Sequence, residues 1–238
     1  QEINQLTSAI GRMKLFLHGV QTFEIINDDT LVHPGFIVNG QLQKFDIVIL
    51  CYCLMSNHFH FILYGEKQDC CAFALEYKRR CGIRLRLYKM EVNALHNLKI
   101  GINEIEDMEY LENAIAYVLR NPLAAKINIM PHHYQWSSAN VYFRGDFKSL
   151  GVPVNDLPER KRQRILKTKL TLSDSYVLDE YGMIAPGCFV DSMMVENIFR
   201  HPSRLLFALA RKLEAEVELK FGIADKVSYT DAELKTLV

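Results

Sequence analysis

The sequence lacks the features that mark membrane and secreted proteins. It has no hydrophobic run long enough to span a membrane, and no signal peptide is visible. Its first residue is Gln, and residues 230–238 have a helix-like composition, so both ends are compatible with trimming. We therefore expect a cytoplasmic protein that has no membrane partner.

The sequence also lacks a paired set of zinc-finger cysteines and an excess of charge of either sign. Its six cysteines contain no two Cys-x-x-Cys clusters, which favours reduced and mostly buried thiols. The formal net charge is zero, so the chain as a whole carries no positive field that would attract nucleic acid. No internal repeat is visible.

Lys and Arg nevertheless gather in two segments, Lys78–Lys89 and Arg160–Lys169. Clustered cations are what a phosphate backbone requires, although a solvated helix face is the common alternative. The candidate DNA-binding residues are Lys78, Arg79, Arg80, Arg84, Arg86, Arg160, Lys161 and Arg162.

Two hydrophobic segments separated by a short connection predict an antiparallel hairpin. Residues 46–52 and 59–64 are rich in β-branched, Leu and aromatic residues, and Met-Ser-Asn stands between them. His58 and His60 flank Phe59 at the start of the second segment. Because side chains alternate along a strand, both imidazoles project from one face, which is half of a divalent-metal site.

Helical spacing appears in several later segments. Gln68–Arg80 and Met108–Arg120 have the apolar periodicity of surface helices, and the proline of Asn121-Pro122 is expected to interrupt the second one. Ser137 is suited to cap a short helix that runs through Tyr142. Leu98–Ile105 is a candidate strand.

The C-terminal part has a different composition. The prolines and glycines of residues 145–158 predict a linker, followed by a basic helix, a loop around residues 182–187 and an amphipathic helix at Pro202–Phe221. We therefore expect a catalytic domain at residues 1–150 and a helical accessory region at residues 151–238, where Arg160–Lys169 would grip nucleic acid.

Tyr117 and Asn121 are four residues apart and share one face of the predicted helix. If this helix packs beside the hairpin, Asn121 offers a hard oxygen ligand beside the two imidazoles, and Tyr117 offers its phenol one turn away. A mixed site of this kind favours Mg²⁺ or Mn²⁺ over structural zinc. A phenol that attacks a metal-polarised phosphate can later act as a leaving group, which suits cutting followed by rejoining.

Three blocks of this sequence, in this order, resemble the single-tyrosine HUH transposase family, especially its REP-associated branch. The blocks are Leu-Met-Ser-Asn-His-Phe-His-Phe-Ile-Leu at residues 54–63, Tyr-Val-Leu-Arg-Asn-Pro-Leu-Ala-Ala at residues 117–125, and Tyr-Gln-Trp-Ser-Ser at residues 134–138. The resemblance covers about residues 45–145. It differs from the family in two respects. Leu123 stands where a basic residue usually follows Asn-Pro, and the family's opening strand of His-x-Thr-x-Arg type has no clean counterpart, with residues 14–22 as the nearest candidate.

The resemblance implies an α+β fold of HUH nuclease type, with a ferredoxin-like antiparallel sheet and helices on its faces. It implies that His58, His60 and Asn121 hold Mg²⁺ or Mn²⁺, and that Tyr117 forms a 5′-phosphotyrosine with single-stranded DNA. The expected partners are single-stranded or hairpin DNA, cut and rejoined as in transposition by a monomer or homodimer.

Two other functions remain open at this stage. The first is a domesticated module that binds structured DNA or RNA without cutting it, in line with the zero net charge and the missing basic residue. The second is a metallohydrolase in which water replaces Tyr117 as nucleophile. Taken singly, the two histidines are compatible with a polar strand face, and Tyr117 and Asn121 with an ordinary helix flank and helix end.

Overall fold

The structure of the chain is a computed structural model. It describes residues 45–55, 58–87, 100–127, 130–145, 151–166, 174–211, 228–229 and 236. The side chains of Arg84, Leu85, Leu87, Ile165, Leu166, Ser228 and Tyr229 are outside this description.

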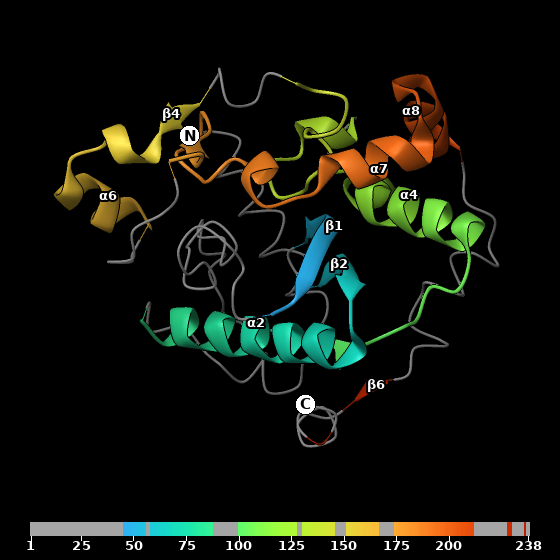
Figure 1. Cartoon of the computed structure of the whole chain (residues 1–238), viewed down its shortest axis with the longest axis horizontal. Helices are drawn as coiled ribbons and strands as arrows, with labels where there is room; N and C mark the ends of the chain where they lie inside the picture. The colour runs from blue at the N-terminus through green and yellow to red at the C-terminus, as the bar shows by residue number, and fades with distance from the viewer. Residues whose placement is uncertain are drawn as a thin grey trace.

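A β-hairpin lies at the centre of the described structure (Figure 1). Its strands, β1 (Ile47–Leu54) and β2 (Phe59–Gly65), pair antiparallel, with a register irregularity between Ile49 and Cys51. The predicted hairpin is thereby confirmed. Most of β1 is buried, as its uninterrupted hydrophobic sequence requires.

Two helices cover the two faces of the hairpin. Helix α2 (Lys67–Leu87) packs on the face that carries Phe59 and Phe61, whose rings lie 4.8 and 5.0 Å from the ring of Tyr77. Helix α4 (Met108–Ala124) packs on the opposite face and contacts both strands. Both helices were predicted, and each extends further than expected.

Helix α4 begins and ends with recognisable caps. The Asp107 carboxylate accepts a hydrogen bond from the Tyr110 backbone N–H, at 2.6 Å. At the other end, the N–H groups of Lys126 and Ile127 reach back to the carbonyls of Leu123 and Pro122, and Lys126 has φ 55°. This is a Schellman closure with a lysine in the left-handed position.

The prediction that Asn121-Pro122 interrupts the helix is wrong. Pro122 lies inside α4. Proline removes the backbone donor that would serve the Val118 carbonyl, but the Asn121 side-chain amide approaches this carbonyl at 3.4 Å and donates to that of Tyr117 at 2.9 Å. A side chain therefore replaces part of the missing backbone pairing.

The free edge of β1 is covered by residues from two distant segments. Leu54 N–H donates to the Trp136 carbonyl and Ser138 N–H to the Tyr52 carbonyl, while Asp191 N–H donates to the carbonyl of Ile49. The helix expected from Ser137 to Tyr142 is absent, because these residues form turns against β1 instead. A short 3₁₀ helix, η1 (Pro131–His133), precedes them.

The remaining elements are short. Strand β3 (Ile100–Gly101), shorter than the predicted strand, pairs with β6 (Ser228–Tyr229), and β4 (Val152–Pro153) pairs with β5 (Val177–Leu178). Two 3₁₀ helices, η2 (Val154–Asp156) and η3 (Pro186–Cys188), and three α-helices complete the described structure. The helices are α6 (Glu159–Leu166), α7 (Ser192–Phe199) and α8 (Pro202–Ala210).

The expected boundary at residue 150 does not divide the core. Val195, Phe199 and Leu205 of α7 and α8 belong to the same buried cluster as β1 and α4. A smaller cluster around Val154 and Tyr176 holds β4 and β5. The described part of the chain after residue 150 contains short strands and turns beside its three α-helices.

Candidate functional site

The two histidines of the hairpin lie together on the face that α4 covers. The ring centroids of His58 and His60 are 5.0 Å apart, and both side chains are partly exposed. Phe59, between them, points to the opposite layer against Tyr77. The alternation predicted from the sequence is thereby confirmed.

Helix α4 brings its tyrosine and asparagine to this histidine pair. The Nε2 atom of His58 lies 3.3 Å from Oδ1 of Asn121, and the ring of His60 lies 5.4 Å from the ring of Tyr117 in an edge-to-face arrangement. Residues from two elements more than fifty positions apart therefore converge on one small, partly exposed volume.

The hydrogen bonds of Asn121 determine which way its amide points. Its nitrogen donates to the Tyr117 carbonyl at 2.9 Å, so its oxygen is directed at His58. The same nitrogen also lies 3.4 Å from the Val118 carbonyl, which the following proline leaves without a backbone donor. These two contacts of the nitrogen fix the direction of the Asn121 side-chain oxygen.

The geometry of His58 and Asn121 fits a shared divalent ion. Two ligands bonded at about 2.1 Å to one ion lie roughly 3.0 Å apart when they are at right angles, and somewhat further apart at wider angles. The observed 3.3 Å between His58 Nε2 and Asn121 Oδ1 is within this range. With His60, the available donors are two imidazole nitrogens and one amide oxygen, a set without thiolate that could hold a divalent ion of the first transition row.

Cys53 stands directly opposite His60 in the register of the hairpin, so its thiol is compared with the imidazoles as a candidate metal ligand. It is fully buried, and burial raises the pKa of its thiol far above the usual value. Within the described residues, no three His, Cys, Asp or Glu side chains are grouped so that they could hold a metal ion. A metal ion bound by His58 and His60 would therefore need the Asn121 oxygen as its third protein ligand among the described residues.

The buried residues around the third sequence block support the hairpin from outside the site. The hydroxyls of Tyr134 and Tyr142 donate to the carbonyls of Leu54 and Leu50, at 2.8 and 2.7 Å. Oγ of Ser138 accepts from the Tyr52 backbone N–H at 3.0 Å. The Tyr-Gln-Trp-Ser-Ser block and Tyr142 thus hold β1 in place.

The candidate DNA-binding residues of α2 are not brought to the histidine pair. Helix α2 lies on the other face of the hairpin, and Lys78 is largely buried. Glu76 pairs with Arg79 at 2.6 Å and with Arg80 at 2.9 Å, and its hydrogen bond raises the pKa of Arg79. Arg86 is exposed, and the side chain of Arg84 lies outside the described residues.

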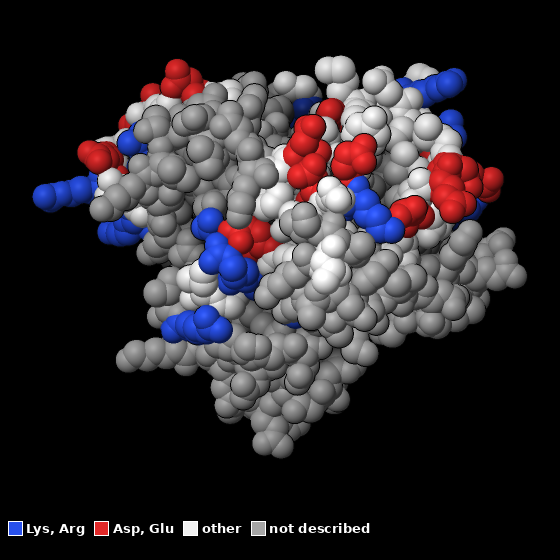
Figure 2. All heavy atoms as spheres, turned by 60° about the horizontal axis from the view of Figure 1, so that its bottom comes forward, with Lys and Arg blue, Asp and Glu red and all other residues white. Residues whose placement is uncertain are grey.

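The other cationic segment is placed on α6. Arg160 and Lys161 are exposed there, and Arg162 donates to Asn155. Figure 1 shows α6 at one end of the molecule, well separated from the hairpin. On the face drawn in Figure 2, acidic and basic side chains of the described residues are interspersed rather than gathered in one positive area.

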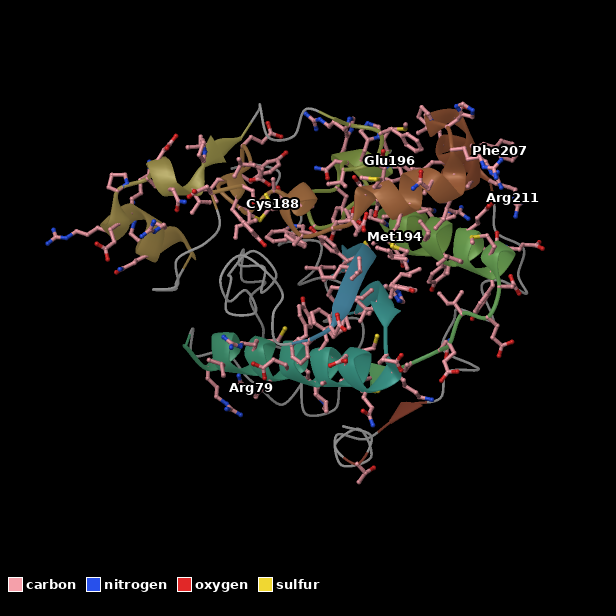
Figure 3. All side chains as sticks on the ribbon, viewed as in Figure 1. Arg79, Cys188, Met194, Glu196, Phe207 and Arg211 are labelled. Carbon is pink, nitrogen blue, oxygen red and sulfur yellow. The ribbon has the colours of Figure 1, made fainter. Side chains whose placement is uncertain are left out.

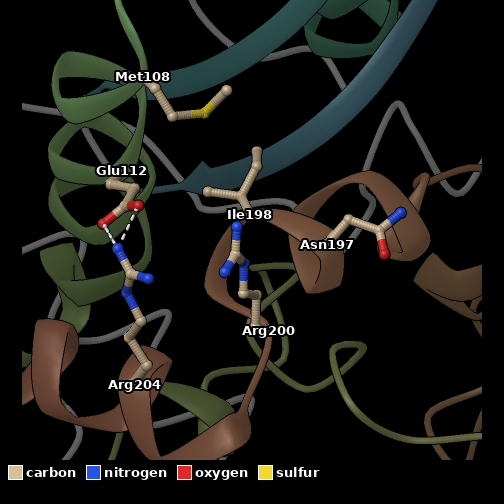
Figure 4. A pocket seen from close by; sticks show the side chains of 6 residues that line it. All are labelled: Met108, Glu112, Asn197, Ile198, Arg200 and Arg204. Carbon is tan, nitrogen blue, oxygen red and sulfur yellow. Dashed lines mark hydrogen bonds and ion pairs between the residues drawn. The ribbon is translucent and has the colours of Figure 1, made fainter.

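A hollow of about 370 Å³ lies on another side of α4, between this helix, α7 and α8 (Figure 4). Its lining residues are Met108, Glu112, Asn197, Ile198, Arg200 and Arg204. Arg204 donates to both oxygens of Glu112, at 2.6 and 2.8 Å. Glu112 precedes Tyr117 by five residues, which is about 140° around the helix, so this hollow is separate from the tyrosine site.

No family model, curated protein or solved structure matches this chain. No helix in the described part of the chain is both long and apolar enough to cross a membrane. Function is therefore inferred from the arrangement of the four side chains and from the resemblance of the three sequence blocks.

Proposed function

We propose that the protein is a metal-dependent transesterase that cleaves and rejoins single-stranded DNA, with Tyr117 as the nucleophile. The observation that carries this proposal is the convergence of His58, His60, Tyr117 and Asn121 on one volume. The sequence alone placed these residues on two separate elements. The proposed reaction requires their four side chains to lie close together.

The proposed reaction exchanges one phosphodiester for another. The Tyr117 phenol loses its proton and its oxygen bonds to phosphorus, while the bond from phosphorus to the 3′ oxygen of the upstream strand breaks. That oxygen takes up a proton and becomes a free 3′ hydroxyl. Attack by another 3′ hydroxyl on the phosphotyrosine reverses these steps and rejoins DNA.

His58, His60 and Asn121 would hold the divalent ion in this proposal. When bound, such an ion acts as a Lewis acid on the phosphate and as a template for it. The protein prepares the site in two ways. Strand β2 and the residue directly before it hold both imidazoles on one face, and the bonds of the Asn121 amide aim its oxygen at His58.

The finer fold assignment belongs to the same proposal. A central antiparallel hairpin with α2 on one face and α4 on the other is compatible with a ferredoxin-like HUH domain. In this assignment α4 delivers the nucleophile and hairpin DNA is the substrate, as in the resembled family. Transposition or the processing of repeats is the corresponding biological role.

The test uses the full chain and hairpin-bearing single-stranded oligonucleotides labelled at either end. With Mg²⁺ or Mn²⁺, we expect the 3′-labelled fragment to migrate with the protein on a denaturing gel and the 5′-labelled fragment to be released. Chelator and Tyr117→Phe should each abolish the covalent band. Tyr110→Phe, on the same helix, should retain it.

Three other results would contradict the proposal. A covalent band that persists in Tyr117→Phe would exclude this nucleophile. Cleavage without any covalent band, retained in Tyr117→Phe, would identify a metallohydrolase. Hairpin binding without cleavage would identify a non-cutting module for structured DNA or RNA.

A further inference from the structure

Arg120 lies between Tyr117 and Asn121 in the sequence of α4, and the site described above gives it no role. Its side chain is partly buried, and its Nε atom is shielded from solvent without a hydrogen-bond partner among the described residues. It is the one charged side chain of the described residues that has such an atom.

An unpaired buried donor on a charged group is costly. Burying a polar group without a partner typically costs about 1–3 kcal/mol in proteins, and more when the group is charged. Native structures satisfy nearly all such groups, and an exception calls for an explanation such as a role in binding. A ligand that accepts a hydrogen bond from the Arg120 guanidinium would remove this cost.

Arg120 is a near neighbour of Tyr117 on helix α4. It follows Tyr117 by three residues, which corresponds to a rotation of about 60° around the helix axis. Residues three apart are surface neighbours, with Cβ atoms typically about 5–6 Å apart. Tyr117, Arg120 and Asn121 therefore occupy one corner of α4.

Three other arginines of the described structure are less suited to serve Tyr117, because each is paired with a carboxylate. Arg79 and Arg80 pair with Glu76 on the helix that covers the opposite face of the hairpin. Arg204 pairs with Glu112 beside the separate hollow on α4. A phosphate at the tyrosine site thus has Arg120 as its nearest cation in sequence and on the same helix corner.

We propose that Arg120 binds the DNA phosphate at the tyrosine site through its guanidinium. This inference rests on the proposed function and deepens it, because it assigns a residue to the non-bridging phosphate oxygens. A guanidinium suits the task because its planar fork matches two oxygens at once, which the point charge of lysine does not. Charge that develops on these oxygens during attack is stabilised by a donor already in place.

The binding step can be tested without cleavage. In the Tyr117→Phe protein, the ¹⁵Nε signal of Arg120, assigned by its loss in Arg120→Lys, is followed by NMR during titration with a short single-stranded oligothymidylate. We expect this signal to shift as the oligonucleotide binds. The Nε signal of Arg204, which is already paired with Glu112, is the internal control and should stay in place.

The catalytic contribution is tested in the otherwise unchanged protein. Arg120→Gln should slow formation of the covalent DNA adduct by about 100-fold, and should reduce the slope of log affinity against log salt by about 0.7. Arg120→Lys should show the salt dependence of the unchanged protein, but it should recover only part of the rate of adduct formation. Lys126→Gln, which removes an exposed cation at the end of the same helix, should change the rate only a few-fold.

The outcomes separate this inference from the proposed function. A static Arg120 signal while the oligonucleotide binds, or no binding at all, would overturn the role of Arg120. An adduct that forms equally fast in Arg120→Gln would do the same while leaving Tyr117 as the nucleophile. A shifted Arg120 signal in a protein that forms no adduct would support phosphate binding and remove the proposed cleavage.

Discussion

Asn121 is the residue on which the proposed metal site depends most. Its oxygen lies 3.3 Å from His58 Nε2, and its nitrogen is committed to the Tyr117 carbonyl. Because no alternative group of acidic, cysteine or histidine ligands occurs among the described residues, its loss leaves only the two imidazoles.

We expect Asn121→Ala to weaken Mn²⁺ binding at least about tenfold, measured by electron paramagnetic resonance of free Mn²⁺. Asn121→Asp should bind Mn²⁺ at least as tightly as the unchanged protein, because a carboxylate is a stronger ligand for this ion. Asn113→Ala, on the same helix but near Arg211, is the matched control and should bind normally. Equal affinity in all variants would remove Asn121 from the site.

Local sequence patterns predicted part of this spatial arrangement of side chains. Strand alternation placed His58 and His60 on one face, and the four-residue spacing placed Tyr117 and Asn121 together. The continuation of the helix through Pro122 was missed, because a side-chain amide replaces the absent backbone donor there. The unpaired Nε of Arg120 depends on tertiary burial and has no local sequence signal.

At the scale of elements, the structure of the hairpin depends on what covers the edge of β1. Ser138 is fully buried and accepts from the Tyr52 N–H, and it also contacts the hydroxyl of Tyr142 at 2.9 Å. The sequence signal for a helix at Ser137 was misleading, because pairing with an otherwise open strand edge outweighs a cap preference.

We expect Ser138→Ala to lower the free energy of unfolding by about 1–3 kcal/mol, since it leaves the buried Tyr52 N–H unpaired. Urea denaturation monitored by circular dichroism measures this loss. Ser203→Ala, at an exposed position on α8, should change the free energy by less than about 0.5 kcal/mol. Equal stability of the two variants would contradict the assigned role of Ser138.

Glu76 forms ion pairs with two arginines of helix α2. This carboxylate is 8% exposed and holds Arg79 and Arg80, and Figure 3 marks Arg79 on this helix. The sequence counted these arginines as free cations for DNA. Their pairing was not predicted, because the count of basic residues gives no information on which of them are neutralised.

If these arginines contact DNA, Glu76→Gln should strengthen binding of single-stranded DNA at low salt and steepen its salt dependence by up to about 0.7 for each released cation. Fluorescence anisotropy over a series of salt concentrations measures both quantities. Glu112→Gln releases Arg204 on another side of the molecule and should leave binding unchanged. Equal effects of the two substitutions would indicate nonspecific attraction.

At the scale of the whole molecule, one core joins segments from both sides of residue 150. Phe199 on α7 is fully buried in the cluster that contains β1 and α4. Composition predicted a linker near this point, but residues 174–211 return to the hairpin through Val190 and α7, and α8 packs on α4. A local composition change therefore did not reveal long-range packing.

We expect Phe199→Ala to cost about 3–5 kcal/mol and to destabilise the hairpin together with α7. Phe207→Ala removes a side chain that is 67% exposed on α8 (Figure 3) and should have little effect. Thermal unfolding followed by both tyrosine fluorescence and circular dichroism should give one shared transition. Two separate transitions, with only one affected by Phe199→Ala, would indicate independent domains.

The central claim is that the phenol of Tyr117 becomes covalently bonded to DNA. Its most direct test is mass spectrometry of the protein after reaction with hairpin-bearing single-stranded DNA and Mn²⁺, nuclease trimming and proteolysis. We predict a nucleotide joined through its 5′ phosphate to the peptide that contains Tyr117, and no such adduct when chelator is present. A nucleotide on another residue, or an unmodified Tyr117 peptide from a reaction in which the DNA was cut, would contradict this account.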